Sequence, residues 1–103
     1  MTVKEIEIQW NDKLEKVTLR TLTARERNNC IRNSVKNFDS KTSKFDMDFM
    51  GLAEQRLFAS IINAPFPHGS LDEMLNSISG ELFDVLTSKV DELNEPSAEL
   101  KKN

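Results

Sequence analysis

The stretch from Ser70 to Asn94, SLDEMLNSISGELFDVLTSKVDELN, decides how the second half of this chain folds. Ser70 and Glu73 have the spacing of a capping box, in which both side chains bond backbone amides at the start of a helix. This predicts a short helix over residues 71–77. A longer helix is predicted over residues 80–93, because its large apolar residues recur at intervals of three and four. They are Leu82, Phe83, Val85, Leu86, Val90 and Leu93. We interpret this pair of helices as an interaction surface.

The first twenty residues show the two-residue period of half-buried strands. Their alternating apolar members are Ile6, Ile8, Trp10, Val17 and Leu19. The segment Asn11–Lys13 between the two runs contains turn-forming residues. The pattern predicts a β-hairpin over residues 3–20. Its apolar face should pack on helices or pair with another chain, because an isolated hairpin is only marginally stable.

Two further helices are predicted between the hairpin and Ser70. Thr23 and Glu26 form another capping box, so a helix should run from about residue 24 to about residue 37. Residues 37–44 have no apolar period and many turn formers, which predicts an exposed loop. A second helix is predicted over residues 46–62, and apolar residues occupy most of its circumference. Such a helix is either central or covered by a partner.

The predicted fold class is α+β, with an N-terminal β-hairpin followed by three to four α-helices in a mostly helical chain. A length of 103 residues suits one domain. We assign this domain to residues 1–95. Residues 96–103 are expected to form a flexible tail, because they carry too little apolar surface to pack.

The net charge is −3, but the charges are unevenly distributed along the chain. Residues 1–44 carry ten Lys and Arg against six Asp and Glu, whereas residues 45–103 carry four against eleven. The two halves could therefore attract one another, or copies of the chain could stack head to tail through opposite faces. Two independently solvated faces are an equally simple interpretation.

The sequence offers no recognisable arrangement for catalysis, metal binding or cofactor binding, so we predict a non-enzymatic protein with none of these. Cys30 is the only cysteine, which leaves too few ligands for a zinc site of the usual kind. We expect it to be a buried helix residue. His68, the only histidine, lies in a predicted loop, so a nucleophilic triad is not expected. Asp46 and Asp48 lack the other ligands of a calcium loop and suit a helix start.

Neither a membrane nor a nucleic acid is the expected partner. No apolar run approaches the ~20 residues that span a bilayer, and the first residues do not resemble a signal peptide, so we expect a cytosolic protein. Arg25, Arg27 and Arg32 stand out among the many basic residues of the first half. No aromatic residues alternate with them, however, and the chain as a whole is acidic. Nucleic-acid binding through this segment is therefore a weaker alternative.

A protein-binding surface is the function that the apolar pattern favours. Thioether side chains such as those of Met47, Met50 and Met74 repack at little cost, which suits transient contact with apolar helices. The predicted partner-binding residues are Phe49, Met50, Leu57, Phe58, Ile61, Leu82, Leu86, Val90 and Leu93. The alternative for each of them is a place in the domain's own core.

Two motifs point to a family. The predicted hairpin leads directly into a Leu-Thr-x-x-Glu helix start at Leu22, Thr23 and Glu26, and the last helix carries Leu-Phe-Asp-x-Leu and Val-Asp-Glu-Leu-Asn between Leu82 and Asn94. With these motifs the chain resembles the small tail assembly chaperones of long-tailed bacterial and archaeal viruses. It is also similar to the small baseplate chaperones of large tailed viruses.

The resemblance implies a non-enzymatic protein of the host cytoplasm. Such a protein would bind the long, helical, aggregation-prone tape-measure protein until tail-tube subunits replace it. The tail-tube protein is then a second expected partner. A homo-oligomer is left open by the opposite charges of the two halves of the chain. Two alternatives remain open: an adaptor or regulatory module that binds another protein, and a weak nucleic-acid binder that uses the Arg-rich first helix.

Overall fold

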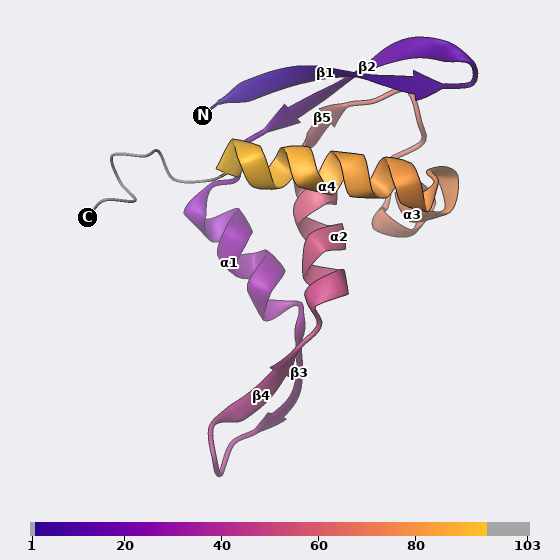
Figure 1. Ribbon diagram of the computed structural model, residues 1–103. Coiled ribbons are helices and arrows are strands. Elements are labelled where there is room, and N and C mark those ends of the chain that lie inside the picture. Colours follow the sequence, from indigo (N-terminus) through magenta and orange to yellow (C-terminus); the bar gives the residue numbers. More distant parts are fainter. Residues whose placement is uncertain (1, 95–103) are drawn as a thin grey trace.

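The computed structural model describes residues 2–94. Along the chain the elements are β1 (Val3–Trp10), β2 (Lys13–Arg20), α1 (Ala24–Arg32), β3 (Val35–Asp39), β4 (Lys44–Met47), α2 (Phe49–Ser60), β5 (Ile61–Asn63), α3 (Leu71–Ser77) and α4 (Gly80–Asn94) (Figure 1). Roughly 46% of the structure is helix and 30% is strand, which confirms the predicted α+β class. The prediction of a mostly helical chain is too strong, because three strands lie beyond the N-terminal hairpin.

The N-terminal hairpin forms where the two-residue period predicts it. β1 and β2 pair antiparallel from Val3 opposite Arg20 to Trp10 opposite Lys13. Asn11 and Asp12 connect the strands, and both have positive φ, 50° and 64°. This is the turn geometry that matches the twist of two antiparallel strands.

A third strand, β5, completes the sheet in the order β1-β2-β5. The predicted bounds of the helix over residues 46–62 are wrong at both ends. α2 begins at Phe49, because the Asp48 side chain caps it by accepting from the Gly51 amide at 3.0 Å. It ends at Ser60, and Ile61 is extended and pairs with Leu19. The free edge of β2 and two consecutive β-branched residues outweigh the helical pattern here.

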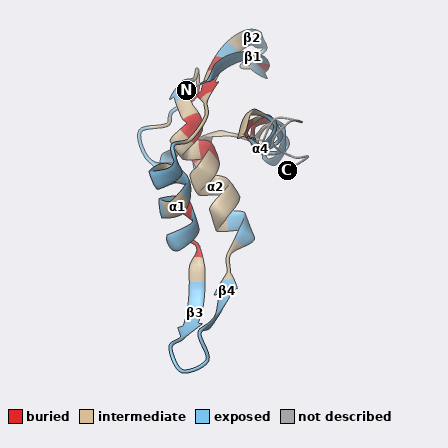
Figure 2. Ribbon diagram, turned by 90° about the vertical axis from the view of Figure 1, so that its left-hand side faces the viewer, coloured by how far each residue is buried: buried red, intermediate tan, exposed pale blue. Residues whose placement is uncertain are grey.

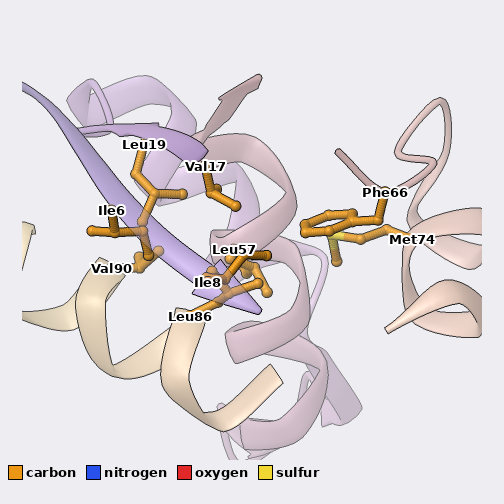
Figure 3. Packing of buried hydrophobic residues seen from close by; sticks show 9 residues of the cluster. All are labelled: Ile6, Ile8, Val17, Leu19, Leu57, Phe66, Met74, Leu86 and Val90. Carbon is orange, nitrogen blue, oxygen red and sulfur yellow. The ribbon is translucent and has the colours of Figure 1, made fainter. Parts of the chain in front are cut away.

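The core lies between the inner face of this sheet and the helices below it. Figure 3 shows side chains from the hairpin, α2, α3 and α4 meeting there. Trp10 packs edge-on against Phe66, with ring centroids 5.7 Å apart. The buried members of the cluster are Ile6, Ile8, Val17, Leu19, Leu57, Phe66, Met74, Leu86 and Val90. This core fixes α4 across the end of α2 that lies nearest the sheet (Figure 1).

The segment between α1 and α2 differs most from its prediction. The predicted helix over residues 24–37 stops at Arg32, and residues 37–44 are not a simple loop. Instead β3 and β4 form a second hairpin, which projects beyond α1 and α2 (Figure 1). We call residues 35–47 the arm. The structure measures 53 × 36 × 21 Å, and its radius of gyration of 15.4 Å exceeds the ~13 Å typical of 100 residues.

An ion pair joins the sheet to α1. Arg20 Nη1 donates to Glu26 Oε1 at 2.8 Å, and the same carboxylate oxygen accepts from the Thr23 amide at 2.9 Å in the predicted capping box. The hydrogen bonds from Arg20, and then that from the Thr23 backbone, lower the pKa of Glu26 to about 2. Glu26 thus stabilises the folded state most when it is ionised.

The predicted flexible tail, residues 96–103, lies outside the described residues. The same holds for the end of the domain at residue 95, since the structure describes the chain only to Asn94.

We predict that Leu86→Ala lowers the free energy of unfolding by about 2–5 kcal/mol, because Leu86 is fully buried and its truncation would leave a cavity. Val85→Ala is a matched control on the same helix. Val85 is 45% exposed, so its truncation should cost about 0.5 kcal/mol or less. Chemical denaturation followed by circular dichroism measures both values. Equal losses would contradict the placement of Leu86 in the core.

We also predict that Glu26→Gln destabilises the protein by about 1 kcal/mol at pH 7, a value reduced for the partial exposure of the pair. The pKa of Glu26 is lowered on folding, so its contribution is present above about pH 4.5 and is lost as the pH falls toward 2. The melting temperatures of variant and wild type should therefore converge across this range. Glu7→Gln makes the same charge change on an exposed strand residue and is the control. A Glu26→Gln deficit that persists at pH 2 would be the contrary result.

Candidate functional site

Three of the nine predicted partner-binding residues belong to the core. Leu57 and Leu86 are 0% exposed, and Val90 is 1% exposed. In this fold they stabilise the domain and offer no surface to a partner, which corrects their assignment. A stripe of apolar residues on one helix face looks the same in the sequence whether a neighbouring helix or another protein covers it.

Four more of the predicted residues are half-buried. Phe58, Ile61, Leu82 and Leu93 pack against the buried cluster from its margin. Phe58 also faces a groove beside α2, described below. These side chains mainly complete the core, and only their outer atoms are accessible.

Phe49 and Met50 are the two predicted residues that the structure exposes most. Their exposed fractions are 75% and 62%. Both lie in the first turn of α2, at the end farthest from the sheet and next to the arm (Figure 2). Of the predicted partner-binding residues, these two at the amino-terminal end of α2 therefore have the most accessible side chains.

The arm adds two aromatic side chains that the sequence analysis did not select. Phe38 on β3 is 63% exposed, and Phe45 on β4 is 52% exposed. Between the pairs Lys36–Asp46 and Asp39–Lys44, β3 has two residues where β4 has one. Asn37 and Phe38 thus lie opposite Phe45 in a β-bulge, and Asn37 has the positive φ of 51° that such bulges use. Two phenylalanines on either side of a polar turn are the signal that could have revealed this hairpin.

We call Phe38, Phe45, Phe49 and Met50 the arm patch. Every residue from Lys36 to Asp46 is exposed, and the arm that carries Phe38 and Phe45 projects away from the core (Figure 2). Burying one large apolar side chain is worth about 1.5–3 kcal/mol. Several exposed at one end of a small protein are typical of a surface that binds another macromolecule.

The junction between the arm and α2 is held by several contacts of Asp48. Its amide donates to the Ser34 carbonyl at 2.7 Å, and its carboxylate lies 3.5 Å from Lys36 Nζ. The hydrogen bond from the Gly51 amide is the main cause that lowers the pKa of Asp48. A Cβ at Gly51 would approach the Asp48 carboxylate to 2.5 Å, so a larger residue there would displace this capping side chain. These contacts set the direction in which the arm leaves the helices.

Two grooves flank α2. The first, of about 390 Å³, lies beside α1 and is lined by Cys30, Phe58, Leu71 and polar residues of both helices. The second, of about 210 Å³, is lined by Met50 and Glu54 of α2, Leu75 of α3, residues 78–80 and Phe83 of α4. We call the second the α2–α4 groove. Met50 belongs both to this groove and to the arm patch, so the two surfaces adjoin.

The residues considered for chemistry have structural roles. Cys30 is buried, and burial raises the pKa of its thiol. His68 Nδ1 lies 2.9 Å from the Phe66 carbonyl oxygen, and its ring packs edge-on against Phe66. Within residues 2–94, no three His, Cys, Asp or Glu side chains gather as metal ligands would.

No helix among the described residues combines the length and apolarity needed to cross a bilayer.

The outer face of α1 is polar and cationic. Arg25, Asn28, Asn29 and Arg32 line a shallow depression there, and Arg32 Nη1 donates to the Asn29 side chain at 3.0 Å. The arginines of this helix, predicted from the sequence as a basic segment, therefore lie at the surface of α1. It lacks exposed aromatic side chains on which bases could stack, because the exposed Phe38, Phe45 and Phe49 lie on the arm and α2.

Comparisons of the chain with protein-family models, with curated proteins and with solved structures find no match.

We predict no measurable binding to single-stranded or duplex DNA at about 0.15 M salt, where charge attraction is screened beyond ~8 Å. The acidic second half of the chain also opposes the basic first half. Fluorescence anisotropy with labelled oligonucleotides measures this. Micromolar binding that is lost in the double variant Arg25→Glu/Arg32→Glu would make α1 the functional surface instead.

Proposed function

We propose that this chain is a non-enzymatic assembly chaperone of a tailed virus, which covers apolar segments of the tape-measure protein in the host cytoplasm until tail-tube subunits replace it. The observation that carries the proposal is the arm patch, where four large apolar side chains are 52–75% exposed at one end of the molecule. The viral partner comes from the resemblance of the Leu22–Glu26 and Leu82–Asn94 motifs to tail assembly chaperones.

The position of the arm patch suits temporary binding. Its residues lie outside the buried cluster, so a partner can cover and leave them without opening the core. Four side chains also limit the affinity, because association must offset the ordering of both surfaces. A chaperone that later yields its partner needs such a moderate affinity.

The chemistry of the patch fits an apolar, helical partner. Phenylalanine rings provide large contact areas, and the unbranched Met50 side chain adapts to surfaces of different shape. Neither group imposes hydrogen-bond geometry, so the patch can cover many segments of similar hydrophobicity. This favours a chaperone over a module that recognises one short sequence.

We predict that co-expression of this chain raises the soluble fraction of the cognate tape-measure protein, and that Phe38→Ser/Phe45→Ser removes most of this effect. Truncating a well-packed aromatic contact costs more than about 1 kcal/mol, so the double variant should bind at least about tenfold more weakly. Gel quantification of soluble and pelleted fractions, with a pull-down, measures both effects.

The control is Leu14→Ser, which removes a side chain that is 66% exposed. Leu14 lies beside the β1–β2 turn, at the opposite end of the molecule from the arm (Figure 1). It should behave as the wild type, and all variants should keep their melting temperatures. The proposal fails if the tape-measure protein precipitates equally with and without this chain. Binding without any gain in solubility would indicate an adaptor instead.

A further inference from the structure

The α2–α4 groove is too small for a typical ligand and suits side chains instead. Its volume of about 210 Å³ lies below the ~300–1,000 Å³ of small-molecule sites. Leu75, Ile78 and Phe83 line it and are half-buried, whereas Met50 at its margin is mostly exposed. It can accept a few apolar side chains from another macromolecule.

The secondary structure around the groove favours a helical occupant. Its lining comes from α2, α3, α4 and the short link between the last two. A bound strand needs a sheet edge to supply hydrogen bonds, whereas a helix satisfies its own backbone and needs only apolar contacts. An amphipathic helix would place side chains at intervals of three and four into the groove.

The surroundings of the groove are acidic. From Leu57 to Ser88 the chain contains no Lys or Arg, but it contains Asp72, Glu73, Glu81 and Asp84, all of which are exposed. Glu54 lies in the groove lining itself. Asp84 is one helical turn beyond Gly80, and Asp72 is one turn before Leu75, so both lie close to lining positions. The apolar side chains that line the groove are thus accompanied by carboxylates on each of the three helices that form it.

We propose that the α2–α4 groove binds an amphipathic helix whose apolar stripe is flanked by Lys or Arg. The stripe would contact Leu75, Ile78 and Phe83, and the basic flanks would face the surrounding carboxylates. This inference rests on the proposed function for the identity of the protein that carries the helix, the tape-measure protein. The groove would select basic amphipathic helices, while the adjoining arm patch covers apolar surface less selectively.

The charge requirement is tested with two labelled helical peptides that share one Leu-rich stripe and differ only in Lys or Glu flanks. The Lys-flanked peptide should bind at least about tenfold more tightly at 0.15 M salt, and the difference should shrink at higher salt. Asp84→Lys should reduce this preference. Equal affinities for the two peptides, or binding of neither, would overturn the proposal.

Gly80 allows the groove to be blocked without disturbing the fold. It lines the groove. Apart from its two neighbours in the chain and the nearby backbone of α4, no described atom lies within 4 Å of a Cβ built at Gly80. Gly80→Trp should fill the groove and weaken binding of the Lys-flanked peptide about tenfold. Gly80→Ala, which adds one methyl group and favours the helix, should bind like the wild type. Both variants should melt no lower than the wild type, and equal affinities of the Trp and Ala variants would contradict the assignment.

The groove and the chaperone function can fail separately. If wild type and Gly80→Trp raise the solubility of the tape-measure protein equally, the groove proposal is wrong and the chaperone function stands. If the Lys-flanked peptide binds in a Gly80-dependent way but the tape-measure protein stays insoluble, the groove proposal stands and the chaperone function is wrong. Analytical ultracentrifugation of the peptide-free protein adds one outcome: self-association abolished by Gly80→Trp would assign the groove to a second copy and overturn the proposal.

Discussion

The packing of the hairpin's inner face against α4 and α2 is the constraint on which the rest of the structure depends. Val17 and Leu19 of β2 lie in one buried cluster with Leu57 of α2 and Leu86 and Val90 of α4. β5, which follows α2 directly, pairs with β2 and holds that end of the helix to the sheet. With its carboxyl end fixed in this way, α2 directs its amino end and the arm away from the core (Figure 1).

This arrangement separates buried from exposed apolar side chains along a single helix. Leu57, near the end of α2, is fully buried, whereas Phe49 and Met50 at its start are exposed. The apolar side chains that are exposed to water therefore lie at positions where they do not contribute to the core. Acidic residues of α3 and α4 lie near the α2–α4 groove, which adjoins the arm patch at Met50. A partner with apolar helices and basic flanks could use both.

Local signals in the sequence predict part of this structure well. The two-residue period yields the first hairpin, and the Thr23–Glu26 capping box yields the start of α1 at Ala24. At the start of α3 only one half of the predicted box is found, in which the Ser70 side chain accepts from the Glu73 amide. The arm is missed because its strands are short and its pairing is irregular, although Phe38 and Phe45 flank its polar turn. β5 is missed because it pairs with β2, which is distant in the sequence, and no local pattern reports such pairing. For the same reason the nine predicted partner residues divide between core and surface. Only the tertiary structure shows that Leu86 faces the sheet and Phe49 faces solvent.

Hydrogen–deuterium exchange of this chain with and without the tape-measure protein tests the central claim most directly, because it locates the contact without any substitution. We expect new protection in the arm, the first turn of α2 and residues 75–83, and little change in β1, β2 and the exposed face of α1. Protection confined to the outer face of α1 or to the β1–β2 sheet, with none in the arm, would contradict the assignment of the partner surface.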